Sequence, residues 1–173
     1  MLFALALAVI LAACGDGSKS AVSDPQPMSL GFTAKQFQER FNVAATTRSF
    51  EYRINGVDIK PSTEIADQWQ YAFSNRIGFL ATVNRSDRTV RSFTYMASGD
   101  GSLKSGADIM LVLSLLIRSI DPALTNETAN ELMLDLMEAV KGESSVERVR
   151  NGIRYGSLNM PTVGFIVAIN PVQ

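Results

Sequence analysis

The sequence predicts an α+β fold, in which an antiparallel sheet of about five to six strands carries an N-terminal helix and two consecutive helices packed on it. Apolar residues recur with helical spacing near residues 33–45, 106–118 and 126–141. Between and after these segments, apolar and polar residues alternate as they do in half-buried strands. Helices and strands come in blocks rather than in strict alternation, which is typical of α+β rather than α/β domains.

The first helix is expected to begin after Thr33. Thr33 and Gln36 have the spacing of a capping box, and Phe32 precedes the cap where it can pack on Phe37 one turn into the helix. The apolar face then continues to about residue 45.

Strands are predicted from alternation and from turn signals. Asn55-Gly56 is the dipeptide most typical of a two-residue hairpin turn, and it separates two alternating runs. The last segment is apolar on both faces, so we expect it in the interior of the sheet. The predicted segments are a hairpin over 50–59 and strands at 68–74, 77–83, 88–97, 147–156 and 162–169.

The two later helices differ in character. Residues 106–118 are apolar nearly all round, which predicts a helix buried on most sides. Thr125 or Asn126 caps the next helix, which is expected to run to Lys141-Gly142. Asp100-Gly101-Ser102 lacks the ligand spacing of an EF-hand and is interpreted as a turn before residues 106–118.

Composition excludes several classes of protein. The 173 residues include 16 basic and 17 acidic side chains, a balance that speaks against nucleic-acid binding. The hydrophobic fraction of 46% is too high for a disordered chain. With no histidine and one cysteine, zinc sites, Ser-His-Asp triads and internal disulfides are excluded or strongly disfavoured, and no cofactor or metal motif remains.

The N-terminal segment indicates where the protein is located. Residues 2–13 form an unbroken apolar run that would span only about 18 Å as a helix, too short for a bilayer but suitable for a signal peptide. Leu11-Ala12-Ala13-Cys14 resembles the lipobox of bacterial lipoproteins. That resemblance implies cleavage before Cys14 and acylation of its sulfur, so that the membrane is reached through a lipid anchor.

The expected organisation is a signal peptide over 1–13, a lipidated flexible tether over 14–30 and one domain over 31–173. Glycine, serine and proline dominate the tether, which lacks enough apolar surface to order itself. Gly15 stands where some lipoproteins carry an aspartate that retains them in the inner membrane, so the resemblance favours the outer membrane, with the domain facing the periplasm. No basic residue precedes Leu2, so a signal peptide's usual basic stretch would have to lie upstream of Met1.

The leading functional hypothesis is a non-enzymatic envelope lipoprotein that binds a protein or envelope component, as assembly factors and inhibitors do. Arg85, Arg88 and Arg91 are the candidate surface for binding an acidic partner or an anionic envelope surface. The simpler interpretation is that these arginines keep one end of a hairpin soluble.

Two alternatives remain open. A small apolar ligand carrier would place a pocket between the sheet and the 106–118 helix, lined by Trp69, Tyr71 and Phe73. A carboxylate-dependent hydrolase would need two of three acids, Asp100, Asp108 and Asp121, to face each other across a cleft.

Overall fold

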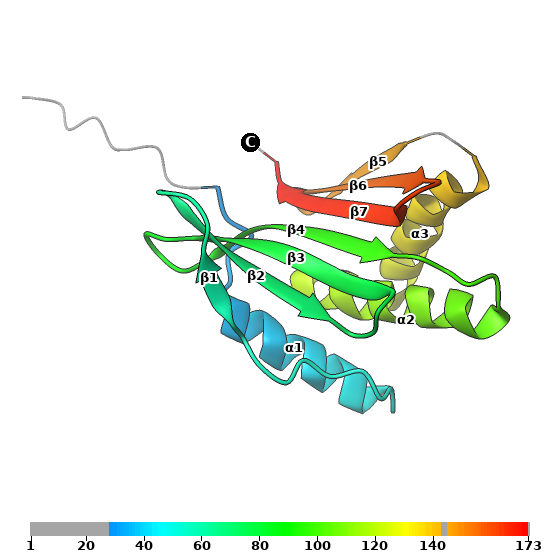
Figure 1. The fold of residues 1–173 in the computed structure, drawn as a ribbon, viewed down its shortest axis with the longest axis horizontal. Helices are drawn as coiled ribbons and strands as arrows, with labels where there is room; N and C mark the ends of the chain where they lie inside the picture. Colours follow the sequence, from blue (N-terminus) through cyan, green and yellow to red (C-terminus); the bar gives the residue numbers. More distant parts are fainter. Residues whose placement is uncertain (1–27, 143–144, 173) are drawn as a thin grey trace, which may run out of the picture.

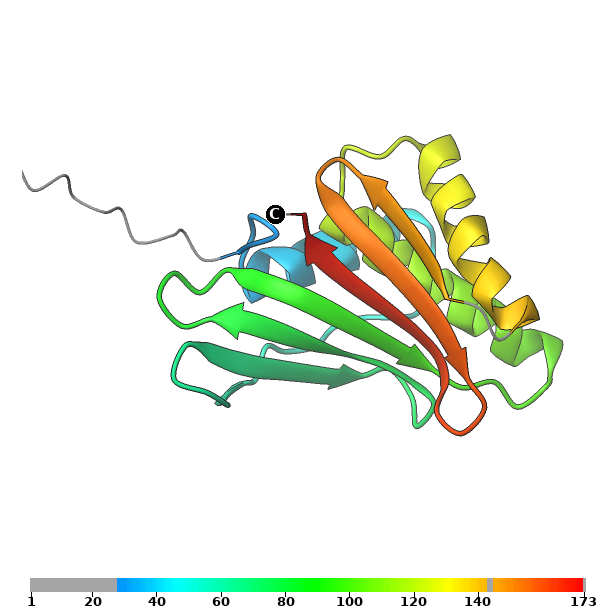
Figure 2. The same ribbon diagram turned by 90° about the horizontal axis from the view of Figure 1, so that it is seen from above.

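The computed structural model describes residues 28–142 and 145–172. The predicted signal peptide, Cys14 and most of the predicted tether lie outside these residues. The described chain forms two layers, a seven-stranded antiparallel sheet and three α-helices that all lie on the same face of that sheet (Figures 1 and 2). The α+β class is therefore confirmed.

The elements follow each other in a simple order. They are α1 (Ala34–Thr47), β1 (Ile59–Pro61), β2 (Ala66–Ala72), β3 (Ile77–Asn84), β4 (Val90–Ala97), α2 (Leu103–Ile120), α3 (Asn126–Met137), the 3-10 helix η1 (Glu138–Lys141), β5 (Val146–Arg150), β6 (Ile153–Met160) and β7 (Gly164–Pro171).

The sheet joins two meanders in the order β1-β2-β3-β4-β7-β6-β5. The first four strands pair in sequence, α2 and α3 cross beneath the sheet, and the last three strands return so that β7 pairs with β4. Phe165, Val167 and Ile169 of β7 are buried against the helices. The predicted interior position of the last strand is confirmed.

The sheet has seven strands rather than the predicted five to six, and residues 147–156, predicted as one strand, form parts of two. Asn151 and Gly152 turn the chain with φ angles of 48° and 75°, so that Arg150 pairs with Ile153. Positive φ at both central residues is the geometry of a type I′ hairpin turn, which Asn-Gly favours. This turn separates β5 from β6.

The predicted hairpin over 50–59 was also wrong. Only Ile59 of this segment joins the sheet, as the first residue of β1. Ile54 is fully buried, and its backbone is bonded by a side chain of α1: Asn42 Oδ1 accepts from Ile54 N at 2.8 Å, and Asn42 Nδ2 donates to Ile54 O at 2.9 Å. An asparagine amide thus satisfies the backbone groups that a neighbouring strand would otherwise have bonded.

The helices form the second layer of the core. The capping box of Thr33 and Gln36 is present, and the ring of Phe37 lies 4.6 Å from that of Phe93, centroid to centroid. Helix α2 contains the predicted 106–118 segment, and its Leu113 is fully buried. None of the helices in the described residues is long and apolar enough to cross a bilayer.

The two consecutive helices pack against different parts of the fold. Helix α2 packs beside α1, whereas α3 contacts β5 and β6 near one edge of the sheet (Figure 2). Thr125 caps α3, which ends at Met137 rather than at Lys141, because the last four residues tighten into η1.

Candidate functional site

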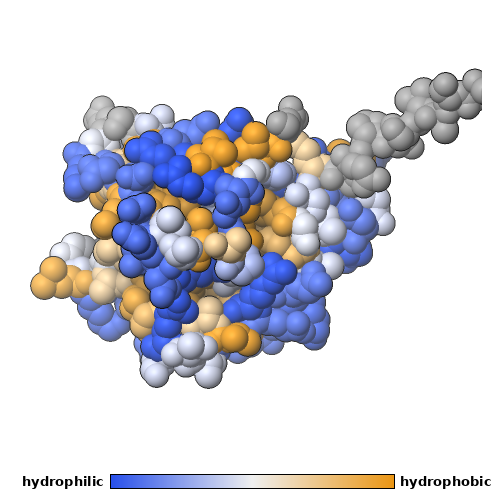
Figure 3. Space-filling view, turned by 180° about the vertical axis from the view of Figure 1, so that it is seen from behind, coloured by the Kyte–Doolittle hydropathy of each residue, from blue (hydrophilic) through white to orange (hydrophobic). Residues whose placement is uncertain are grey.

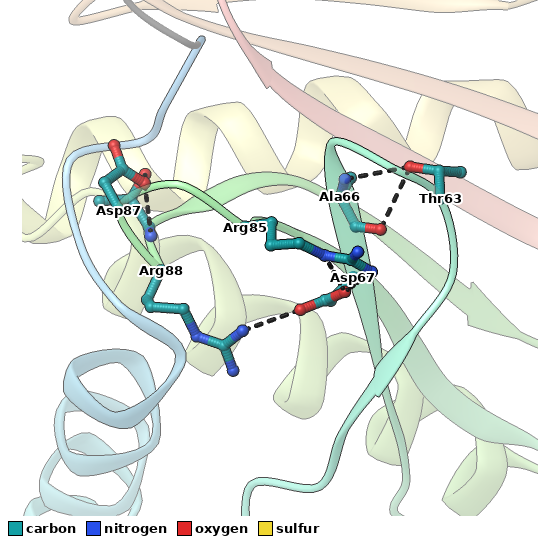
Figure 4. A network of polar contacts seen from close by, with 7 residues as sticks. Thr63, Ala66, Asp67, Arg85, Asp87 and Arg88 are labelled. Carbon is teal, nitrogen blue, oxygen red and sulfur yellow. Dashed lines mark hydrogen bonds and ion pairs between the residues drawn. The ribbon is translucent and has the colours of Figure 1, made fainter.

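Two of the three candidate arginines bind a carboxylate within the same chain. Arg85 contacts Asp67 Oδ1 through Nε at 3.0 Å and Nη2 at 2.6 Å, and Arg88 Nη1 contacts Asp67 Oδ2 at 2.8 Å (Figure 4). The Asp67 side chain is only 8% exposed, whereas those of Arg85 and Arg88 are 44% and 52% exposed. The two guanidinium groups therefore close over one carboxylate at the β3–β4 hairpin.

The backbone of the hairpin brings both arginines to Asp67. Arg88 adopts a φ of 62° and its N–H donates to Asn84 O, which closes the tight turn between β3 and β4. The hydrogen bond from Arg85, and then the charges of both arginines, hold the pKa of Asp67 below its usual range. This arrangement fixes the hairpin to β2 and leaves one positive charge of the pair unmatched by Asp67.

Arg91 does not join this group. The register between β3 and β4 shifts so that Val83 pairs with Val90 and Thr82 with Ser92, which makes Arg91 the extra residue of a β-bulge. The structure therefore unites Arg85 and Arg88 but not all three candidate residues.

Of the aromatic residues proposed for a ligand pocket, Trp69 belongs to the core, and Tyr71 and Phe73 pack against it half-buried. Trp69 is fully buried, with its ring 4.9 Å from that of Phe79. The Tyr71 hydroxyl donates to Arg53 O at 2.8 Å, and the ring of Phe73 stacks on Phe41 at 5.2 Å. Trp69 therefore fills the core, whereas the half-buried Tyr71 and Phe73 border a hollow of about 570 Å³ beside the 51–55 segment. Neither Trp69 nor any residue of α2 lines that hollow, so it is not the pocket expected between the sheet and the 106–118 helix.

Two of the three carboxylates proposed for hydrolysis lie at opposite ends of helix α2. Asp108 lies near the start of α2 and binds Lys104 Nζ at 2.7 Å, whereas Asp121 follows the last residue of the same helix and accepts from Asn151 Nδ2 at 2.9 Å. Thirteen residues of helix separate them by about 20 Å. Hydrogen bonds to Lys104 and Ser102 lower the pKa values of Asp108 and Asp100, which is opposite to what a general acid needs.

The structure reveals a groove that the sequence did not indicate. It has a volume of about 470 Å³ and lies between the loop from β4 to α2 and the turn from β6 to β7. Its lining contains no charged side chain and consists of Ala97, Ser98, Gly99, Gly101, Ser102, Gly106, Ile109, Met137, Val140, Asn159, Pro161, Thr162, Val163, Gly164 and Phe165. We call it the end groove.

Glycines shape the walls of the end groove. Gly164 has a φ of 102°, and a Cβ there would collide with the carbonyl oxygen of Ala97, so only glycine lets the β6–β7 turn lie this close to β4. Gly106 is not required for close packing, because a Cβ at this position would meet nothing within 4 Å. The Ser98-to-Ser102 segment, which the sequence marks as a turn, forms one wall.

Exposed apolar side chains surround the end groove. Leu103 is 95% exposed, Val163 47% and Val140 41%. Figure 3 shows hydrophobic groups among hydrophilic ones at the end of the molecule away from the start of the described chain. Volumes of about 300–1,000 Å³ with a largely apolar lining are typical of sites for small ligands or for inserted side chains.

No set of three or more acidic or sulfur ligands in the described residues is grouped to hold a metal ion. Comparison of the chain with protein-family models, with curated proteins and with solved structures gives no match.

Proposed function

We propose that this chain is a lipid-anchored protein of the bacterial cell envelope whose domain binds a protein partner without catalysing a reaction. The lipobox-like run ending at Cys14 supports the anchor, and the end groove is the observation that supports binding. Two or more acyl chains on one cysteine give a stable attachment, because each buried methylene contributes about 0.8 kcal/mol.

The place of the end groove relative to the anchor favours contact with a partner. The described chain starts beside the β3–β4 hairpin, where Asn84 Nδ2 donates to Met28 O at 2.8 Å. The groove begins at Ala97, at the opposite end of β4. Eight residues of strand span roughly 26 Å, so an anchor at the Met28 end would leave the groove facing away from the bilayer.

The chemistry of the lining favours a neutral, apolar segment of the partner. Without a charged side chain in its lining, the groove offers no counter-charge to an acidic or basic peptide. Ile109, Met137 and Phe165 provide apolar contact, and Ser98, Asn159 and Thr162 provide hydrogen-bonding groups at the same site. This combination of apolar contact with a few polar groups is typical of recognition pockets.

The test fills the groove without disturbing the fold. Gly106→Leu places a side chain in the open space beside Gly106 and also replaces a poor helix former in α2. Ala107→Leu is the matched control, because Ala107 is the next residue of α2, is exposed and does not line the groove.

Both variants are made in the full chain, which carries a photo-crosslinking amino acid at Val163 in the groove or at Val43 on α1. We expect Val163, but not Val43, to form an adduct of defined mass with one envelope protein. Gly106→Leu should abolish that adduct, and Ala107→Leu should retain it. Equal adducts at both positions, or an adduct that survives Gly106→Leu, would contradict the proposal.

A small apolar ligand is the second candidate, because the volume of about 470 Å³ suits one. Native mass spectrometry of the full chain distinguishes the two candidates. A carrier would retain a bound small molecule that Gly106→Leu displaces, and Val163 would then form no protein adduct.

A further inference from the structure

The middle of the sheet face opposite the helices carries few charges. On the five strands β2, β3, β4, β7 and β6, regular alternation places one charged side chain, Arg154, on this side, and Arg91 lies in the bulge of β4. Lys60 of β1, which pairs with Gln68, and Glu147 of β5, which pairs with Gly156, flank the face at its two edges. Arg154 Nε lies 3.3 Å from Glu147 Oε1 on the adjacent β5. The residues that alternation places on this side of the five strands, which we call the open face, are Gln68, Gln70, Ala72, Gly78, Leu80, Thr82, Ser92, Thr94, Met96, Arg154, Gly156, Leu158, Met160, Gly164, Ile166, Ala168 and Asn170.

An apolar stripe crosses the middle of the open face. Met96 of β4 pairs with Ile166 of β7, which pairs with Leu158 of β6, and Leu80 lies on the neighbouring β3. Leu158 is 38% exposed, and no helix covers this side of the sheet (Figure 2). Antiparallel sheets with one face in water usually alternate apolar residues inside with polar residues outside, so an outer face bearing such a stripe is typical of a contact surface.

We propose that the open face packs against the open face of a second copy of this chain. Two identical faces with charges of one sign would repel each other, but the charges at the two edges of this face are paired: Arg154 lies 3.3 Å from Glu147, and Lys60 lies 3.5 Å from Asp58. Small residues beside the stripe, including Gly156 and Ala168, project little from the sheet. Two such sheets can therefore stack about 10 Å apart.

The size of the open face suits such a pair. Five strands spaced about 4.8 Å apart and about 25 Å long give a footprint of roughly 600 Å². Two faces would bury roughly 1,200 Å² in total, the lower end of the range for specific interfaces. A modest interface is sufficient on a membrane, because anchoring confines the two copies and raises their effective concentration.

The relative orientation of the two copies rests on the proposed lipid anchor. Two copies in one bilayer must both have their Met28 ends towards that bilayer, so the two-fold axis runs along the strands. In that arrangement β4, the middle strand, faces β4 of the second copy at the small angle typical of stacked sheets. Thr94 then lies near Thr94 of the second copy, and Met96 near its counterpart.

The first experiment places charges at the centre of the contact. Thr94→Arg and Thr94→Glu are made separately in the full chain, and sedimentation in detergent is followed across a concentration series. We expect the parent to form dimers, each variant alone to sediment as a monomer, and an equal mixture of the two variants to recover dimers, because Arg then meets Glu. Val43→Arg on the exposed side of α1 is the matched control and should dimerise like the parent.

The second experiment tests the orientation in membranes. Met96→Cys copies should join through a disulfide on mild oxidation, because the parallel arrangement brings like positions together, whereas Val43→Cys copies should not. Co-expressed Ser92→Cys and Met96→Cys copies should cross-link less than Met96→Cys alone. Preferential joining of Ser92→Cys to Met96→Cys would indicate copies pointing in opposite directions and would overturn the proposed orientation.

A parent that remains monomeric in detergent and gives no Met96→Cys cross-link in membranes would overturn the dimer itself. That outcome is distinct from failure of the proposed function, because the dimer tests use the open face and the partner tests use the end groove. Thermal melting of both Thr94 variants checks that they fold like the parent, so loss of dimers cannot be mistaken for unfolding.

Discussion

Helix α2 provides two leucines that differ mainly in burial. Leu113 is fully buried beneath the sheet, whereas Leu103 is 95% exposed at the first residue of the same helix. Changing either leucine to alanine removes the same three carbon atoms. For Leu113, lost burial at about 0.8 kcal/mol per carbon gives about 2.4 kcal/mol. The remaining cavity raises the expected loss to about 3–4 kcal/mol.

Leu103→Ala should change the free energy of unfolding by less than about 0.5 kcal/mol, because no packed contact is lost. Denaturant titration gives these differences directly, and thermal melting should lower the Tm of Leu113→Ala by about 10 °C. Equal losses in the two variants would refute the reasoning, since Leu103 would then have to be buried or α2 would have to be absent. Leu113→Asp should be more damaging still, because it buries an unpaired carboxylate.

Three further predictions concern other parts of the chain. Cys14→Ser should release the protein from membranes, and mass spectrometry of the parent should show an acylated N-terminal peptide that begins at Cys14. The pKa of Asp67 is lowered in the folded state, so its ion pairs stabilise the fold above about pH 4 and this stabilisation is lost as the pH falls through the lowered pKa. Asp67→Asn should therefore make the free energy of unfolding fall less steeply towards acid pH, as measured by denaturant titration at a series of pH values. Gly152→Ala should destabilise by about 1–2 kcal/mol because of its φ of 75°, whereas Gly56→Ala should have little effect, since it lacks a positive φ and has open space around it.

The two Asn-Gly pairs show how far local signals specify this fold. Asn151-Gly152 makes the two-residue turn that this dipeptide favours, and the strands on each side of it have room to pair. Asn55-Gly56 has the same local preference, but Ile54 just before it is buried and bonded to Asn42 of α1. Packing against a helix twelve residues away thus overrides the turn, and no local pattern contains that contact.

Signals that depend on near neighbours were more reliable. The capping box at Thr33 and the cap at Thr125 are present, because these side chains bond backbone groups within three residues. The apolar run within α2 predicted a buried helix correctly, since a helix with few polar positions has to be enclosed. Helix ends and buried segments can therefore be read from the sequence, whereas strand pairing depends on partners far along the chain.

The candidate sites likewise depend on contacts between residues far apart in the sequence. Charge is easily seen in a sequence, so Arg85, Arg88 and Arg91 were natural candidates, yet Asp67, which engages two of them, lies eighteen residues before Arg85 and on another strand. The end groove has a neutral lining, and neutral residues such as Gly106 and Val163 give no local signal. They become a groove only when the loop after β4 meets the turn before β7. The apolar stripe of the open face likewise forms only when Met96, Ile166 and Leu158 of three strands align on one side of the sheet. For this chain, the surfaces best suited to binding are those that form only through tertiary assembly, which is why their recognition required the fold.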